Sequence, residues 1–145
     1  MGGLIVENIS FVNEISVSDY NMLRLSAGWS EIEESQALTG LQNTRYLISA
    51  KYDKKTVGMA RWITDGGYIA FIADVIVLPD YQNQGIGKSM MTMVMDNIKN
   101  SLKEGQSVYI GLMASKGKEI FYKSFEFVDR PNDSLGAGMT LWFSK

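Results

Sequence analysis

Apolar and polar residues alternate along the middle of this chain in the pattern of β-strands. Short apolar runs are separated there by an Asp-Lys pair and by an Asp-Gly-Gly triplet, both of which favour turns. The pattern predicts strands over 45–52 and 55–64, joined as a hairpin, and a third strand over 68–78. The third strand is apolar on both faces, which is typical of a strand inside a covered sheet.

The segment after the third strand has helical spacing. Its apolar residues fall three and four positions apart, which predicts an amphipathic helix over 86–102. The predicted stripe consists of Ile86, Met90, Met91, Val94, Met95, Ile98 and Leu102. Its methionines need no role beyond packing, because flexible thioethers fill irregular gaps in cores.

The N-terminal part is predicted to form a strand and a helix. The strand covers residues 4–13. Ser18 is expected to cap the helix, which turns Tyr20, Leu23 and Leu25 inward and ends at Gly28.

A second short helix is expected to follow and to end near Leu41. Ser30 and Glu33 have the spacing of a capping box, with Ser30 as the N-cap. Together with Glu31 and Glu34, Glu33 also forms an acidic run that suits a cation-recognising patch. We favour the capping role for this run.

The C-terminal part begins after Gly105 with a predicted strand over 107–113 and a short helix over 117–125. A final pair of strands is expected over 127–130 and 139–143, joined by a polar, glycine-rich loop. No repeat, linker or low-complexity segment interrupts the chain. Residues 1–145 are therefore expected to form a single domain.

Composition narrows the class of protein. A hydrophobic fraction of 46% and a charged fraction of 21% are typical of ordinary globular domains. The net charge of −2 argues against a nucleic-acid partner, and no apolar run approaches the roughly 18 residues that span a membrane. With no secretory signal and no cysteine, the cytoplasm is the expected compartment.

The absence of histidine and cysteine removes several chemistries. The chain has no thiol nucleophile and no imidazole base, and a zinc site would have to rest on carboxylates alone. No metal is therefore expected. Any proton transfer must use a carboxyl group, tyrosine, lysine, the backbone or water.

The segment from Gln82 to Ser89 is the strongest candidate binding site. Gly85 and Gly87 precede the predicted helix, so the backbone can approach a bound group while the helix N-terminus favours an anion such as a diphosphate. The ending Gly-Lys-Ser is shared with P-loops, but G-x-x-x-x-G-K-[ST] needs glycine where this chain has Gln82. A P-loop protein that binds ATP with magnesium is therefore the weaker alternative.

The same segment, Gln82-x-x-Gly85-x-Gly87, resembles the [Q/R]-x-x-G-x-[G/A] signature of the GCN5-related N-acetyltransferase (GNAT) superfamily. The predicted order β-α-α-β-β-β-α-β-α-β-β is also the order of that fold. The resemblance implies an α/β (α+β) fold of the acyl-CoA N-acyltransferase type. Its central sheet is mixed and mostly antiparallel, with helices on both faces. It also implies acetyl-CoA as cosubstrate.

The resemblance implies three groups of coenzyme contacts. The strand would offer main-chain groups to the pantetheine arm and one amide to the thioester carbonyl, and the turn would hold the diphosphate. The expected contact residues are Val75, Ile76 and Val77 on the strand, Gln82, Asn83, Gln84, Gly85, Ile86, Gly87, Lys88 and Ser89 at the turn, and Ser115 and Tyr122 in the C-terminal part.

Tyr122 lies in a stretch, residues 120–127, that resembles the φ-Y-E-K-φ-G-F segment of the family. There the tyrosine hydroxyl protonates the leaving thiolate, so Tyr122 is a catalytic candidate; the alternative is a core aromatic residue. Three residues depart from the family pattern: Glu126 stands at a usual glycine, Ser115 at a usual asparagine and Lys118 at a usual alanine.

Asp74 is the only charged residue in the apolar strand. Because a buried carboxylate must be paired or hydrogen-bonded, it either pairs with an arginine such as Arg61 or acts on the acceptor amine as orienting group and proton acceptor. Phe71 occupies the position at which many relatives carry a glutamate base. Trp29 is a candidate lid over the acceptor pocket, with a plain core role as the alternative.

These features predict transfer of an acetyl group from acetyl-CoA to a primary amine by direct attack, without a covalent enzyme intermediate. A small-molecule acceptor is favoured over a protein, and a homodimer is one state of assembly to test. The alternative is a non-catalytic, coenzyme A-binding sensor or regulatory domain. Phe71 and Glu126 keep that alternative open.

Overall fold

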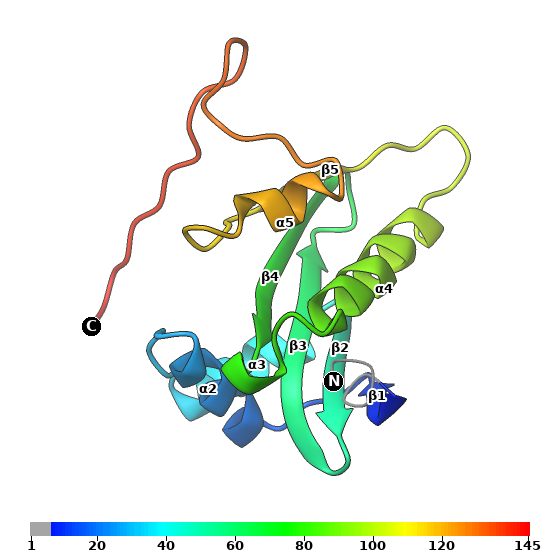
Figure 1. Cartoon of the computed structure of the whole chain (residues 1–145). Coiled ribbons are helices and arrows are strands. Elements are labelled where there is room, and N and C mark those ends of the chain that lie inside the picture. The colour runs from blue at the N-terminus through cyan, green and yellow to red at the C-terminus, as the bar shows by residue number, and fades with distance from the viewer. Residues whose placement is uncertain (1–6) are drawn as a thin grey trace. The chain divides into compact units, whose positions relative to one another are not determined.

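The structure, a computed structural model, describes residues 7–145 and divides the chain into two compact units (Figure 1). The first unit ends at Leu112 and the second runs from Met113 to Lys145. The predicted start of the first strand, residues 4–6, lies outside the described residues.

The elements follow the predicted order as far as the last helix. They are β1 (Ile9–Val12), α2 (Val17–Ser26), α3 (Glu34–Gln42), β2 (Tyr46–Tyr52), β3 (Lys55–Thr64), β4 (Ile69–Val77), the 3₁₀ turn η1 (Pro79–Tyr81), α4 (Ile86–Asn100), β5 (Tyr109–Leu112) and α5 (Glu119–Lys123). The hairpin, the central strand and the long helix are therefore confirmed.

The first unit is built on a five-stranded sheet in the order β1-β2-β3-β4-β5. Neighbours are antiparallel from β1 to β4, whereas β4 and β5 are parallel. A parallel pair needs a long crossover connection, and α4 supplies it. The prediction of a mixed, mostly antiparallel sheet is confirmed.

Helices cover both faces of this sheet. Arg61 and Trp62 are adjacent on β3, so their side chains point to opposite faces. The Trp62 indole donates a hydrogen bond to Asn97 of α4 (2.9 Å), while Arg61 lies on the face that contacts α2. The two helices therefore flank the sheet, as predicted.

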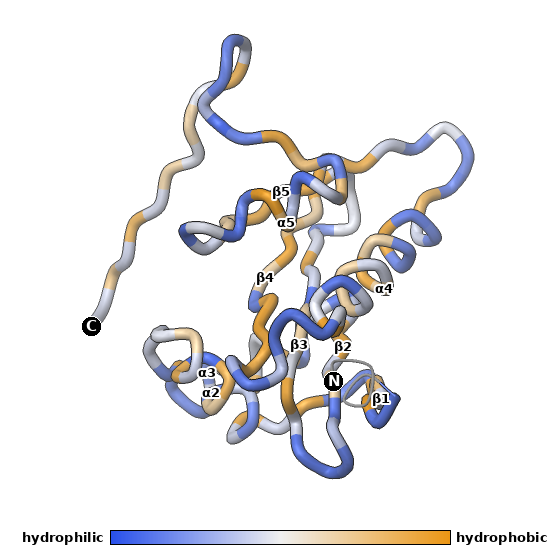
Figure 2. Tube along the Cα trace, viewed as in Figure 1, coloured by the Kyte–Doolittle hydropathy of each residue, from blue (hydrophilic) through white to orange (hydrophobic). Residues whose placement is uncertain are grey.

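The core of the first unit lies between the sheet and these helices. Figure 2 shows apolar stretches along β3, β4 and α4, and α4 contacts both strands. The predicted stripe of α4 is buried at Ile86, Met90, Met91, Val94 and Ile98, and only half-buried at Met95 and Leu102. No helix within residues 7–145 has both the length and the apolar character to cross a membrane.

Gly58 marks the closest approach between β3, β4 and α4. A Cβ at this position would lie 2.9 Å from the Ile76 carbonyl oxygen and 3.1 Å from the Met90 Cε atom. The first contact is with backbone that belongs to the centre of the sheet, so it cannot move away freely.

Gly58→Ala should therefore destabilise the protein by about 1–3 kcal/mol, the usual effect of overpacking a core. Thermal unfolding followed by circular dichroism measures the effect as a Tm lower by several degrees. Gly40→Ala is the matched control, because Gly40 lies in α3 with open space around its Cβ position. Equal Tm values for the two variants would contradict the close packing at Gly58.

Both predicted helix caps in the N-terminal part are wrong. The N-cap of α2 is Ser16 rather than Ser18, and its hydroxyl accepts the Asp19 N–H at 3.0 Å. Glu33, rather than Ser30, is the N-cap of α3, and its carboxylate accepts the N–H groups of the next turn.

The orientation of α2 is confirmed at Tyr20 and Leu23, which are buried. It is wrong at Leu25, which is 54% exposed. Positions 20 and 23 are one turn apart and face the sheet, whereas position 25 lies on another face of the helix.

The predicted final strand pair is also absent. Residues 127–130 and 139–143 form no strand in the structure. Their apolar pattern suits strands, but a strand exists only where its main chain finds a partner, and within the C-terminal unit these segments do not pair.

Candidate active site

Asp74 lies at a β-bulge in the centre of the sheet. Arg61 pairs with Ala73 and Met59 with Ile76, so β4 advances from 73 to 76 while β3 moves only from 61 to 59. Asp74 occupies the left-handed region at φ 53°, which aspartate and asparagine tolerate better than most residues. The bulge bends β4 and turns this side chain out of the regular alternation.

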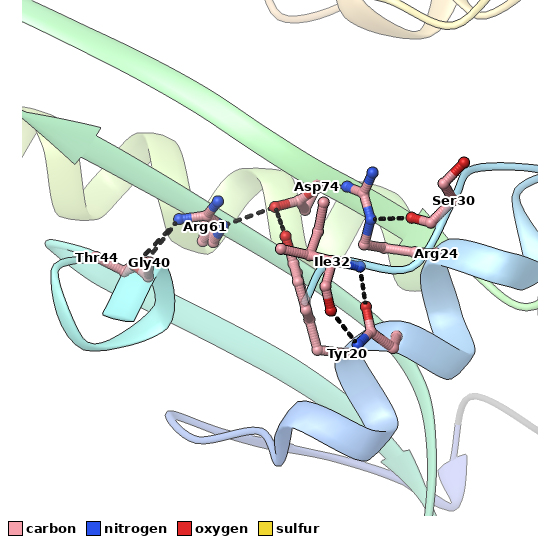
Figure 3. Close-up of polar contacts among 9 residues, drawn as sticks. Tyr20, Arg24, Ser30, Ile32, Gly40, Thr44, Arg61 and Asp74 are labelled. Carbon is pink, nitrogen blue, oxygen red and sulfur yellow. Dashed lines mark hydrogen bonds and ion pairs between the residues drawn. The ribbon is translucent and has the colours of Figure 1, made fainter. Parts of the chain in front are cut away.

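Three donors from two elements converge on the Asp74 carboxylate (Figure 3). Tyr20 of α2 donates its hydroxyl to Oδ2 at 2.8 Å, and Arg61 of β3 donates Nε–H to the same oxygen at 2.7 Å. Arg24 of α2 donates from Nη1 to Oδ1 at 3.0 Å. The expected pairing of Asp74 with Arg61 is confirmed, and its other two partners were not predicted.

The side chains of this cluster are almost excluded from solvent. The Asp74, Arg24 and Arg61 side chains are 8%, 10% and 14% exposed. Burial, and then the neighbouring Asp74 carboxylate, raise the pKa of the Tyr20 hydroxyl, so Tyr20 remains a donor at neutral pH. The carboxylate accepts three hydrogen bonds, two of them from guanidinium groups.

The two arginines extend the cluster into the connections around α3. Arg24 donates Nε–H to the Ser30 carbonyl at 2.8 Å, and its guanidinium lies 5.4 Å from the centre of the Trp29 ring. Arg61 donates to the Thr44 hydroxyl at 2.9 Å. The network fixes the loop that carries Trp29 relative to the bulge, and Trp29 itself is half-buried.

Past the bulge, β4 has a paired and an unpaired edge. Its last pair with β5 is Ile72 with Leu112, whereas its pairing with β3 continues to Val77. The Leu78 N–H donates to the Val57 carbonyl, so Gly58 and Val77 are a non-hydrogen-bonded pair and the Val77 main chain points away from β3.

The Gln82 side chain holds this unpaired end of β4. Its Nε2 donates to the Val77 carbonyl at 2.9 Å. The Val77 N–H is a main-chain donor on this open edge. Gln82 therefore connects the turn to the end of β4. The sequence motif alone did not reveal this contact.

The turn that follows places left-handed residues on either side of Gln84: Asn83 at φ 61° and Gly85 at φ 82°. Gly85 is the N-cap of α4 and supplies no side-chain cap. The first helical bond is from Ser89 N–H to the Gly85 carbonyl, so the N–H groups of residues 86–88 have no acceptor within the helix. The α4 N-terminus thus presents three main-chain donors with the positive end of a helix dipole.

The remaining predicted site residues lie in the C-terminal unit. Tyr122 is buried on α5, and its ring packs edge-on against Phe121, with centroids 5.0 Å apart. Burial raises the pKa of Tyr122 to about 12. Ser115 is exposed in the loop before α5, where its carbonyl accepts the Lys118 N–H at 2.9 Å.

The acidic run lines an open hollow of about 620 Å³ beside the start of α2. Within it, Glu33 is committed to capping α3, and hydrogen bonds from Ser35 and Gln36 lower the pKa of its carboxyl group. The preference for a capping role is confirmed at Glu33.

The chain resembles known acetyltransferases in both sequence and structure. A family model described as an acetyltransferase (GNAT) domain matches residues 43–129. The chain belongs to the GNAT family of acetyltransferases.

The chain is similar to proteins from several lineages. An uncharacterised N-acetyltransferase, ycf52, of Pyropia yezoensis is 30% identical over 88% of this chain and 74% of its own length. A crystal structure of a probable acetyltransferase of unknown function from methicillin-resistant Staphylococcus aureus is 32% identical, with a TM-score of 0.84 over 93% of this chain and 99% of that one. A Glycine max relative named histone acetyltransferase TAP1 is 27% identical over 90% of this chain and 61% of its own length.

The turn of this GNAT protein suits a ligand with the chemistry of coenzyme A. The N–H groups at the start of α4 suit phosphate oxygens, and a Cβ at Gly85 would meet nothing within 4 Å, so the surface there is open. Among buried side-chain atoms of residues 7–145, the Gln84 Oε1 atom lacks a hydrogen-bond partner. An unpaired buried acceptor suits the amide or hydroxyl donors that coenzyme A also carries.

Sequence reasoning missed Tyr20 and Arg24 as partners of Asp74. The two lie four residues apart on α2, hence on one helical face, and that face also carries the buried Leu23. An arginine on an otherwise apolar face was the available signal. It pointed to a buried acid somewhere, although not to Asp74 in particular.

Proposed function

We propose that this GNAT protein transfers an acetyl group from acetyl-CoA to a primary amine by direct attack. The observation that carries the proposal is the open edge of β4 running into the uncapped N-terminus of α4. One extended anionic ligand would use the main-chain donor at Val77 and those at residues 86–88.

Each part of the turn has a separate task in this proposal. The N–H groups at the start of α4 hold the diphosphate, with Lys88 and the Ser89 hydroxyl nearby, while residues 82–84 shape the turn. Val75, Ile76 and Val77 bind the pantetheine arm as a strand would, and one of their amides polarises the acetyl carbonyl. Acetyl-CoA, when bound, supplies the acetyl group as a thioester.

Tyr122 is proposed as the donor to the leaving sulfur. Its pKa of about 12 keeps the hydroxyl protonated at neutral pH. Because an ordinary thiol has a pKa of about 8.5, complete transfer of this proton is uphill. Tyr122 therefore acts first as a hydrogen-bond donor that stabilises the departing thiolate, and Ser115 is proposed as a coenzyme contact in the same unit.

The amine must lose a proton before it attacks, since an alkylammonium has a pKa of about 10.4. The Asp74 carboxylate is the candidate acceptor named from the sequence, and its role in proton transfer stays a prediction. Its three hydrogen bonds favour a holding role, in which it fixes the bulge and, through Arg24, the loop of Trp29. Trp29 remains the candidate lid over the acceptor.

The acceptor is proposed to be a small molecule, because the chain is compact and carries a net charge of −2. A protein amine is the competing class, because a Glycine max relative is named a histone acetyltransferase. We further propose that both units act as one acetyltransferase domain, because the family match crosses the boundary between them, and that the reaction takes place in the cytoplasm.

An acceptor screen with a thiol readout tests the activity. The protein is mixed with acetyl-CoA and a panel of polyamines, amino acids, amino sugars and lysine peptides, and free thiol is followed with a chromogenic reagent. The chain contains no cysteine, so the reagent detects only coenzyme A. Acetylated product in step with thiol release is expected for at least one amine.

A coenzyme A-binding sensor is the second candidate function. The occupied carboxylate of Asp74 and the phenyl group of Phe71 favour it, because neither offers a ready base beside the sheet. A sensor would bind acetyl-CoA in calorimetry and release no thiol with any amine. Absence of binding would reject both functions.

Gly87→Glu tests the cofactor turn. Gly87 lies inside α4, where a side chain is conformationally acceptable, so the variant should fold. The added carboxylate brings bulk and like charge to the diphosphate site and should weaken acetyl-CoA binding at least about tenfold, roughly 1.4 kcal/mol. Isothermal titration calorimetry measures it, with Gly40→Glu on α3 as the matched control, and unchanged affinity would reject the site.

A further inference from the structure

The ion cluster at the β4 bulge holds more positive than negative charge. The guanidinium groups of Arg24 and Arg61 both pair with the single carboxylate of Asp74. The Tyr20 hydroxyl stays neutral, because burial and the neighbouring carboxylate raise its pKa. Within residues 7–145, no other carboxylate lies within ion-pair distance of either arginine. Two positive charges and one negative charge therefore leave an excess of one positive charge in a place where an unbalanced charge is costly.

Each arginine also has one guanidinium nitrogen to spare. Arg24 uses Nε for a main-chain carbonyl and Nη1 for Asp74, whereas Arg61 uses Nε for Asp74 and Nη1 for the Thr44 hydroxyl. Among the described residues, the buried side-chain polar atom without a partner is the Gln84 Oε1 atom. The two Nη2 groups are therefore not sealed in the core but reach the surface, which agrees with side chains that are 10% and 14% exposed. Each Nη2 group offers two N–H donors there.

The two guanidinium groups lie close to each other. Both bind the same carboxylate, and their central carbon atoms lie 5.8 Å and 6.0 Å from the centre of the Tyr20 ring. Figure 3 shows Arg24 and Arg61 on either side of Asp74. A planar guanidinium presents N–H groups that match the oxygens of a carboxylate. One further carboxylate would balance the charge of the cluster, whereas a phosphate dianion would exceed it.

The cluster lies next to the strand proposed to bind the thioester. Asp74 directly precedes Val75, and the open edge of β4 runs to Val77. A strand advances about 3.3 Å per residue, so the stretch from 74 to 77 covers about 10 Å. An acceptor held at the arginines by a carboxylate would therefore place an amine a few bonds away beside the acetyl group.

We propose that the acceptor is an amino acid or another short amino-carboxylate, whose carboxylate binds the Nη2 groups of Arg24 and Arg61. The inference rests on the proposed acetyl transfer and names its acceptor class. The carboxylate neutralises the cluster, and the amine at the other end attacks the thioester. A carbon–nitrogen bond forms and the carbon–sulfur bond breaks, with its electron pair leaving on sulfur. The ammonium loses two protons, of which one goes to the thiolate and one to solvent.

Matched acceptors test this class with the full chain. β-Alanine and γ-aminobutyrate are compared with their amides, which keep the amine and the chain length but lack the negative charge. The kcat/KM for the acids should exceed that for the amides roughly 10- to 100-fold, the effect of a charged hydrogen bond. A nearby carboxylate makes an amine more basic, so this preference cannot come from a larger neutral fraction of the acids. Equal kcat/KM values, or a preference for carboxylate-free polyamines, would overturn the proposal.

Arg24→Lys and Arg61→Lys keep the positive charge and remove the paired N–H groups. Each should lower the ratio of kcat/KM for acid to that for amide about tenfold, mainly through KM. The ratio cancels any general loss of activity, so it separates recognition of the carboxylate from a purely structural role of the cluster. Arg45→Lys, at an exposed arginine, is the matched control and should keep the wild-type ratio. An unchanged ratio in both cluster variants would contradict the proposal.

Binding without turnover separates this proposal from the reaction itself. The chain has four arginines, so their side-chain N–H signals are few enough to resolve by NMR and to assign with the lysine variants. In the presence of coenzyme A, β-alanine should shift the signals of Arg24 and Arg61 in a saturable way, and its amide should not. If no amine releases thiol, acetyl transfer is wrong, yet this shift would still support the carboxylate site. No shift, or the same shift with the amide, would overturn the site.

Discussion

Asp74→Asn should lower the free energy of unfolding by about 3–5 kcal/mol, the effect of removing one partner from a buried ion cluster. Asparagine fits the left-handed backbone at φ 53°, so the substitution changes charge more than conformation. Its amide presents only one oxygen, so its NH2 group must face Arg24 or the pair Tyr20 and Arg61. Two guanidinium groups then remain buried without a counter-charge.

Thermal unfolding should show this as a Tm lower by on the order of 10 °C. Asp96→Asn is the matched control, since Asp96 is exposed on α4 and should change the Tm little. An Asp74→Asn protein as stable as the control would show that the ion cluster contributes nothing to the fold.

The same variant separates the two roles of Asp74. A holding role predicts a pH profile of kcat/KM parallel to that of the wild type. A role as proton acceptor predicts a larger loss at about pH 6.5 than at about pH 9, because the amine is then almost fully protonated. The three hydrogen bonds to the carboxylate favour the parallel profile, and the steeper acid loss would restore Asp74 as the base.

Tyr122→Phe should lower kcat by about 10²-fold or more while leaving the affinity for acetyl-CoA unchanged, because only the transition state needs the hydroxyl. With a pKa of about 12, the hydroxyl stays protonated throughout an assay range of about pH 6.5–9.5. The loss should therefore be the same at every pH in that range. Steady-state kinetics and calorimetry measure the two quantities.

Tyr68→Phe is the matched control, because Tyr68 is 64% exposed and should lose its hydroxyl without effect. Near wild-type turnover in Tyr122→Phe, with chemistry shown to be rate-limiting, would assign Tyr122 to the core.

The stability of the protein at alkaline pH gives a second readout for Tyr122. The folded pKa lies above the usual value of about 10, so the protein keeps this contribution below about pH 10 and loses it as pH rises toward 12. Tyr122→Phe should remove that alkaline loss.

Local patterns identified most of the first unit. The hairpin at β2 and β3, the buried strand β4 and the long helix α4 each depend on alternation or helical spacing among near neighbours, and all were confirmed. The glycine turn at Gln82 was identified for the same reason. Its left-handed residues and helix start are encoded within a few positions of the motif.

Predictions from local patterns failed where two nearby residues could fill the same role, and where an element depends on a partner far away in the sequence. Ser16 and Ser18 are both plausible caps, and only the packed position of α2 selects the first. Residues 139–143 have a strand pattern, yet no partner within their own unit provides hydrogen bonds for them.

By itself, the sequence determined the family, the element order to the last helix and the place of the glycine turn, because these follow from local spacing and from a motif of few residues. Only the tertiary structure decided which side chains donate hydrogen bonds to the Asp74 carboxylate. Its partners Tyr20 and Arg24 come from a helix 54 and 50 residues earlier, and no periodicity connects such positions. A buried carboxylate accepts whichever donors the packed helix and strand bring to it, so its bonding is settled by packing and not by its neighbours in sequence.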